Sequence, residues 1–145
     1  YLDDVDAGRD PVTPIPAPPT SIVAAPRRYR RDELLAAAGA APQLLNDAIS
    51  TGVIAAAESY TEQTVALLRC LVALDRHGIE PRHIRTLRQS AERDAALVES
   101  AVAPLSRRTD ATSRGRAEEL APELARRLEE VRSIFLRSAL ERFLS

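Results

Sequence analysis

The sequence contains one cysteine and two phenylalanines, and it has no tryptophan, methionine or lysine. A single cysteine, Cys70, excludes an internal disulfide framework and a metal site built from several cysteines. No apolar run approaches the ~20 residues that a membrane-spanning helix needs, and no basic stretch followed by an apolar core suggests a signal peptide. We therefore expect a cytoplasmic protein that makes no membrane contact.

Arginine and alanine dominate what is present. All 20 cations are arginine, and they nearly balance 21 acidic residues, so the formal net charge is −1. Alanine contributes 25 residues, whereas aromatic residues make up only 3%. Abundant alanine and leucine with few β-branched or aromatic residues favour packed helices over a sheet. The sequence predicts an all-α fold with at most a minimal β wing.

Proline and aspartate separate residues 1–26 from the rest of the chain. Six of the ten prolines and four aspartates lie in this segment. Because proline fixes φ and removes a backbone donor, we expect an extended or disordered linker followed by a helical domain over 27–145. The first residue is Tyr1 rather than methionine, so we expect a fragment or a processed chain, with part of the function lying upstream.

Helix signals divide residues 27–145 into five predicted helices. The first two are expected over 32–38 and 42–51, and the third from a cap at Thr61 to about His77. The fourth is expected from Pro81 to a stop or kink at Pro104. The last helix either begins close to Ala121 or begins further upstream and bends at Pro122. Left-handed residues that follow or interrupt helices are expected at Gly39, Gly52, Gly78 and Gly115, the last in a polar turn over 109–115. The first two helices are joined only by Gly39-Ala40-Ala41, which is typical of a helix-turn-helix. Residues 53–60 are expected to form a turn or a reduced wing.

The predicted third helix carries aliphatic residues around half of its circumference, so we expect it to be the most buried one. On it, Cys70 is expected to be a small packing residue rather than a redox sensor. Cys70 and His77 lie too far apart along the helix to bind one metal ion, and His83 is separated from them by Gly78 and Pro81. No phosphate-binding glycine loop or catalytic triad order is found. We expect no cofactor, no metal and no enzymatic activity.

The order of several short motifs resembles the winged helix-turn-helix of MerR-type regulators. The motifs are Glu33-Leu34-Leu35, Ala38-Gly39, Gly52-Val53-Ile54, Tyr60-Thr61-Glu62 and Gly78-Ile79-Glu80-Pro81-Arg82-His83-Ile84. Residues 92–105 are similar to the C-terminal region of a narrower group, the FtsR-type regulators of cell-division genes. The resemblance implies a MerR-like winged helix-turn-helix extended by a long helix and a C-terminal helix. It also implies that a missing N-terminal domain reads the DNA.

The residues themselves argue against DNA reading by this domain. A recognition helix approaches a polyanion and normally carries arginine or lysine, yet residues 40–51 contain no cation and include Asp47. Residues 54–59 contain no arginine and include Glu58. We therefore expect weak or absent DNA binding by this domain alone, with DNA bound through the full-length protein.

Two arginine clusters leave two interpretations open. The residues concerned are Arg28, Arg30, Arg31, Arg82 and Arg85. They either make weak phosphate contacts or form a solvated surface, and nearby acidic residues such as Asp32 and Glu80 favour the second interpretation.

The last predicted helix is apolar on two sides near its end, which predicts a partner surface. The residues that we expect at the interface of a homodimer are Leu128, Val131, Phe135, Leu136, Leu140 and Phe143. The alternative is that they pack inside one subunit. For function, we predict the oligomerisation or effector domain of a transcription regulator, with an unknown effector. The alternatives are a helical protein-interaction adaptor without a DNA role, and a domain that binds a small molecule between the third, fourth and fifth helices.

Overall fold

The computed structural model describes residues 26–145, and five helices account for most of them. They are α1 (Arg31–Ala38), α2 (Pro42–Ser50), α3 (Glu62–Asp75), α4 (Pro81–Ser106) and α5 (Ala111–Leu144). Within these residues no strand forms, and an isolated antiparallel bridge joins Tyr29 to Tyr60. The all-α prediction is confirmed. The linker predicted over 1–26 lies, except for its last residue, outside the described part of the chain.

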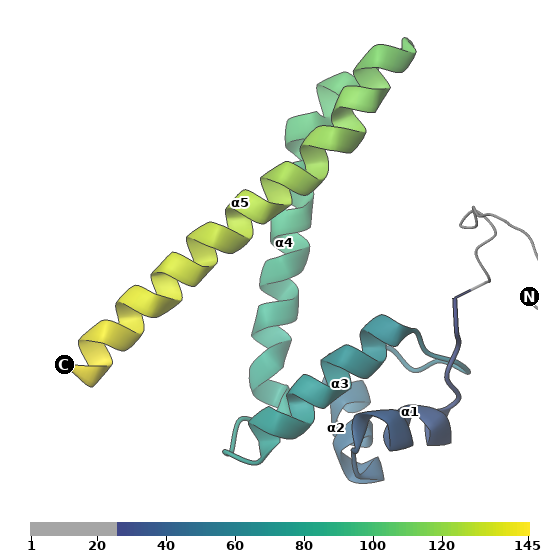
Figure 1. Cartoon of the computed structure of the whole chain (residues 1–145), viewed down its shortest axis with the longest axis vertical. Helices are drawn as coiled ribbons and strands as arrows, with labels where there is room; N and C mark the ends of the chain where they lie inside the picture. Colours follow the sequence, from purple (N-terminus) through teal and green to yellow (C-terminus); the bar gives the residue numbers. More distant parts are fainter. Residues whose placement is uncertain (1–25) are drawn as a thin grey trace, which may run out of the picture.

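Helices α1, α2 and α3 form a small unit at one end of the molecule (Figure 1). Gly39 ends α1 in the left-handed conformation (φ 65°), and α2 begins only three residues later. This confirms the predicted helix-turn-helix connection. The core of the unit is mainly aliphatic and includes two buried tyrosines, and its largest fully buried side chains are those of Leu34, Leu45, Val53, Val65, Leu68 and Leu71.

Helix α3 starts as predicted, because the Thr61 hydroxyl accepts a hydrogen bond from the backbone N–H of Thr64. Its burial was overestimated. Val65, Leu68 and Leu71 are buried, whereas Ala66 and Ala73 are exposed. The prediction that Cys70 is a buried packing residue is wrong, since this side chain is exposed. The reason is that α1 and α2 cover one side of α3, and α5 does not return to cover the other (Figure 1).

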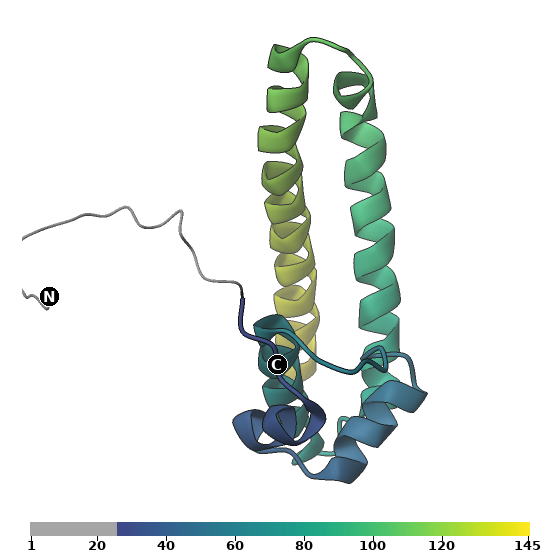
Figure 2. The ribbon, with the colours of Figure 1, turned by 90° about the vertical axis from the view of Figure 1, so that its right-hand side faces the viewer.

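Helices α4 and α5 form a long antiparallel hairpin that rises from the small unit (Figures 1 and 2). Val102 of α4 and Ala117 of α5 are buried where the two helices meet. Asp110 caps α5 by accepting a hydrogen bond of 2.9 Å from the backbone N–H of Ser113. The bonds from Ser113 lower the pKa of Asp110, because they stabilise the charged carboxylate.

The expected position of the last turn was wrong. Helix α5 begins at Ala111 rather than near Ala121, and Gly115 lies inside it instead of in a left-handed turn. The Asp110 cap and the packing of small side chains against α4 favour helix here despite the low intrinsic propensity of glycine. Pro122 is exposed and lies within α5, although its ring removes one backbone donor. Pro104 likewise lies inside α4, which ends two residues later at Ser106.

The position of the core predicts which side-chain truncations lower the free energy of unfolding most. Leu68 is fully buried, whereas Leu97 on α4 is 61% exposed. We expect Leu68→Ala to lower the free energy of unfolding by about 2–5 kcal/mol, since it leaves a cavity. We expect Leu97→Ala to cost less than about 1 kcal/mol. Urea unfolding followed by circular dichroism measures both, and equal costs would contradict the placement of the core in the α1–α3 unit.

Candidate functional site

Helix α2 is the second helix of the helix-turn-helix, so its outer side is the first candidate surface. Gln43, Asn46 and Ser50 are exposed there, and Asp47 is half-buried. The Gln43 amide donates to a carboxylate oxygen of Asp47 at 2.8 Å. The helix contains no cation of its own, so this side is neutral to acidic and does not complement phosphate.

One cation reaches α2 from the neighbouring helix. A terminal nitrogen (Nη2) of Arg31, at the start of α1, donates to the amide oxygen of Asn46 at 2.6 Å. The sequence placed Arg31 in an N-terminal arginine run and gave no sign that it lies over α2. A single guanidinium held by an amide adds little to the affinity of this surface for nucleic acid.

The arginines considered for phosphate contacts lie on different elements. They are Arg28 before α1, Arg30 and Arg31 at its start, and Arg82 and Arg85 in α4. Arg82 forms an ion pair with Glu80, with 2.8 Å between Nε and Oε1. Both side chains of this pair are largely exposed, so it has little effect on stability. Phosphate contacts by these five residues stay a prediction.

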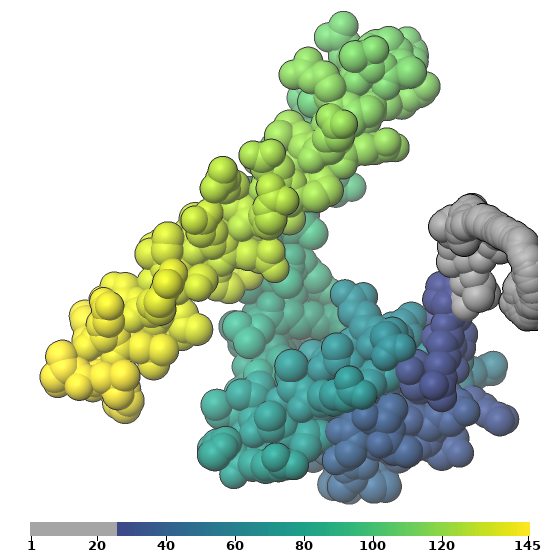
Figure 3. Space-filling view, in the orientation of Figure 1, coloured from purple at the N-terminus to yellow at the C-terminus, as the bar shows by residue number. Residues whose placement is uncertain are grey.

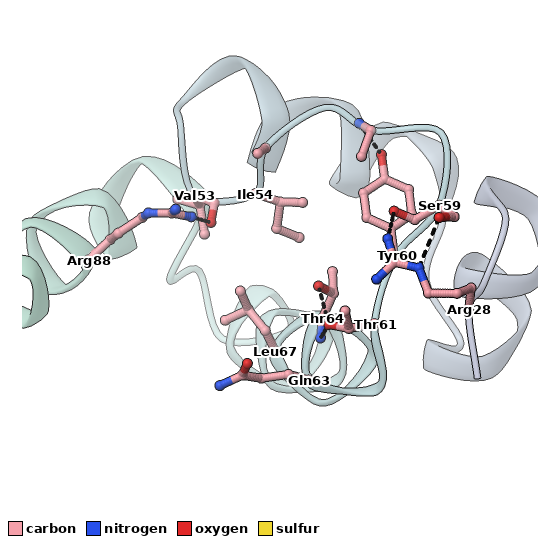
Figure 4. Close-up of a pocket in the computed structure, with 12 residues that line it drawn as sticks. Arg28, Val53, Ile54, Ser59, Tyr60, Thr61, Gln63, Thr64, Leu67 and Arg88 are labelled. Carbon is pink, nitrogen blue, oxygen red and sulfur yellow. Dashed lines mark hydrogen bonds between the residues drawn. The ribbon is translucent and has the colours of Figure 1, made fainter. Parts of the chain in front are cut away.

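A second candidate is a cavity of about 540 Å³ bounded by the 53–60 loop, α3 and α4 (Figure 4). Two arginines hold the loop at its two ends. Arg28 donates from Nε and Nη2 to the hydroxyl and the backbone carbonyl of Ser59, each at 3.0 Å. Arg88 donates to the carbonyl of Val53 at 2.5 Å. Neither contact was foreseen, because each joins residues more than 30 positions apart in the sequence.

The 53–60 loop is joined to the start of the domain by two tyrosines. The backbones of Tyr29 and Tyr60 exchange hydrogen bonds of 2.8 and 2.7 Å. The Tyr29 hydroxyl donates to Glu62 at 2.8 Å, and this bond to a carboxylate raises the pKa of Tyr29. The bridge therefore ties the entry of the chain to the loop and to the first turn of α3.

The third candidate is the last part of α5, which has seven exposed apolar side chains. We call this segment the α5 apolar end, and its residues are Val131, Ile134, Phe135, Leu136, Leu140, Phe143 and Leu144. Phe135 is 69% exposed and Phe143 is 80% exposed. Figure 3 shows this end projecting away from the other helices. Of the six predicted interface residues, five lie here, whereas Leu128 is half-buried and lines grooves beside α4.

The α5 apolar end begins where α5 leaves α4. At this point Arg132 donates to Asp94 and to the hydroxyl of Ser90, the latter at 3.0 Å. The Asp94 carboxylate is only 25% exposed, so this ion pair is better shielded than the others on the two helices. Beyond it, the described residues include no partner for the apolar side chains of α5.

The remaining chemistry of the described residues is sparse. Between residues 26 and 145, no three His, Cys, Asp or Glu side chains are grouped so that they could hold a metal ion. His83 accepts a hydrogen bond from the backbone N–H of Glu80 and so serves as a cap for α4. None of the five helices within these residues combines the length and the hydropathy that a membrane-spanning segment requires.

Comparison with known proteins places the chain in a family. The family model described as "Rv1828-like, C-terminal domain" matches residues 27–144. Two relatives are 36% identical over 100 residues, which is 68% of this chain and 40% of each relative. They are named uncharacterized HTH-type transcriptional regulators, Rv1828 of Mycobacterium tuberculosis and Mb1859 of Mycobacterium bovis. The match thus spans well under half of the length of these relatives.

The family match extends through all five helices and includes both the 53–60 loop and the α5 apolar end. The chain belongs to the family of Rv1828-like C-terminal domains.

Proposed function

We propose that this chain is the C-terminal association domain of a helix-turn-helix transcription regulator. In this proposal, two copies join through the α5 apolar end, and DNA-reading parts elsewhere in the protein are thereby held as a pair. A two-fold dimer of that kind matches an operator with two-fold symmetry. The observation that carries the proposal is the cluster of seven exposed apolar side chains on one helix end.

The energy of burial favours an extended partner over a small ligand at this end. Each large apolar side chain gives about 1.5–3 kcal/mol when it passes from water to full burial. Association costs about 4–15 kcal/mol in lost freedom, so a stable complex must cover most of the seven side chains together. A second helix laid along α5 does this, whereas a small molecule covers only one or two of them.

A second copy of the chain fits the charges of this segment. Arg137 and Glu141 are one helical turn apart within the α5 apolar end. When two copies meet in antiparallel orientation near this turn, each arginine lies close to the glutamate of the other copy. A parallel, in-register pair would instead bring like charges together. Arg137 and Glu141 can thus form ion pairs across an antiparallel two-fold interface.

The finer identity of the regulator is also part of this proposal. The sequence resemblance supports a MerR-type protein of the FtsR group with a cytoplasmic location, and the names of the relatives support a role in transcription.

An effector function is the second role that we propose for the domain. A helical adaptor that binds a different protein would use the same apolar end, and the oligomeric state separates these two functions.

Substitution of Phe135 tests the association. We expect the wild-type chain to show the mass of a dimer in light scattering and Phe135→Asp to show that of a monomer, because a buried carboxylate opposes the interface. Helicity measured by circular dichroism should stay unchanged, since Phe135 is 69% exposed and lies outside the core of the α1–α3 unit.

Leu97→Asp is the matched control for this experiment. Leu97 is also exposed and apolar, but it lies on α4 outside the α5 apolar end. This variant should remain dimeric. A wild-type chain that is monomeric at every concentration measured would overturn association through α5.

The α2 surface gives a prediction about DNA. We expect residues 27–145 to show no sub-micromolar, sequence-selective binding to duplex DNA in fluorescence anisotropy, and selection from random duplexes should enrich no motif. The double variant Gln43→Arg/Asn46→Arg adds two cations to the exposed side of α2. It should bind duplex DNA more tightly and with a steeper dependence on salt. A motif selected by the unmodified domain would refute this prediction.

A further inference from the structure

The cavity below the 53–60 loop has a positively charged lining, whereas the chain as a whole is nearly neutral. Among residues 26–145, its lining includes Arg28 and Arg88 but no aspartate or glutamate, although the whole chain has a net charge of −1. Between the two arginines the walls are mainly apolar, with Ile54 and Leu67 on opposite sides (Figure 4). The cavity therefore combines positive charge with an apolar middle.

The two arginines are not equivalent. Arg88 donates to the Val53 carbonyl and also lies 3.4 Å from a carboxylate oxygen of Glu92, so its charge is partly neutralised. Arg28 donates to two oxygens of Ser59, and neither of them belongs to a carboxylate. A guanidinium has five N–H donors in a planar fork, and this geometry suits a carboxylate or phosphate group. The Arg28 end is thus the better position for an anion.

Hydroxyl groups lie at the same end of the cavity. Thr61, Thr64 and Ser59 line it next to Arg28 (Figure 4). The Thr61 and Thr64 hydroxyls are 3.2 Å apart, and Thr61 also caps α3. Gln63 lines the cavity as well and is exposed. These groups supply further donors to an anionic group, and Ile54 and Leu67 can cover an attached apolar body.

We propose that this cavity binds a small molecule that carries a carboxylate or phosphate group on an apolar body. Its anionic group contacts Arg28, and its apolar part lies between Ile54 and Leu67. The site gives a location to the effector role and in that respect rests on the proposed function. Ligand binding at the cavity is nevertheless independent of whether α5 self-associates, and the two are measured separately.

The test is an NMR titration of the whole chain with four probes that share a short alkyl chain. Hexanoate and hexyl phosphate carry the anion, hexanol is neutral, and hexylamine is cationic. We expect the two anions to shift the backbone amides of Ile54, Thr64 and Leu67 with saturation, and hexanol and hexylamine to bind at least about tenfold more weakly. The stronger of the two anions identifies the preferred headgroup. Light scattering on the same samples reports association through α5.

Two variants examine the role of charge. Arg28→Gln should weaken hexanoate and hexyl phosphate binding by about tenfold or more, and Arg28→Lys should restore part of it. Because Arg28 also tethers the loop, Gln63→Glu is the second variant, since it adds a negative charge of nearly equal shape and removes none of the loop tethers. It should weaken both anions, whereas its control Gln43→Glu on α2 should not.

Several outcomes would overturn the proposal. They are amide shifts confined to the α5 apolar end, equal affinity for hexanoate and hexanol, and unchanged anion binding in both Arg28→Gln and Gln63→Glu. A monomeric chain that binds the anions at the cavity would refute association but leave this site intact. A dimeric chain without anion binding would refute the site alone.

Discussion

The contact between α4 and α5 ends near Arg132, well before the end of α5, and the candidate partner surface follows from that limit. Small and aliphatic side chains fill the contact from Val102 and Ala117 onward, until Arg132 pairs with Asp94. A shielded ion pair can fix the relative orientation of two helices, but it buries little apolar surface. Beyond it, the hydrophobic residues of α5 have no cover among the described helices. The same sequence thus builds a hairpin and leaves the apolar side chains at the end of α5 exposed.

Arginine has a structural role in this chain that the nearly balanced charge conceals. Several guanidinium groups bond to backbone carbonyls that lie far away in the sequence, among them Arg28 to Ser59, Arg69 to Ala37 and Arg88 to Val53. The planar fork of arginine can form more than one such bond at once, which a lysine ammonium does less well. The absence of lysine is consistent with this use.

The sequence predicted what depends on neighbouring residues and missed what depends on distant ones. Thr61, Pro42 and Pro81 mark the beginnings of α3, α2 and α4 by local chemistry, and those beginnings were correct. The start of α5 was placed too late, because the low helix propensity of Gly115 is visible in the sequence, whereas the burial of Ser113 and Ala117 on either side of it is not. By contrast, the spacing of hydrophobic residues correctly located the apolar residues near the end of α5. The cavity could not be foreseen, since Arg28 and Arg88 meet it from different elements.

The cavity and the α5 apolar end are joined by a single helix, α4. Arg88 of α4 holds the loop above the cavity, and Asp94, six residues further along the same helix, holds α5 where it turns away. Six residues of α-helix span about 9 Å. The core of the α1–α3 unit depends on inward side chains such as Leu45, whereas DNA reading would depend on outward ones such as Asn46. The core can therefore hold the helix-turn-helix together whichever residues lie on its outer side, and α4 connects this unit to the hairpin that carries the α5 apolar end.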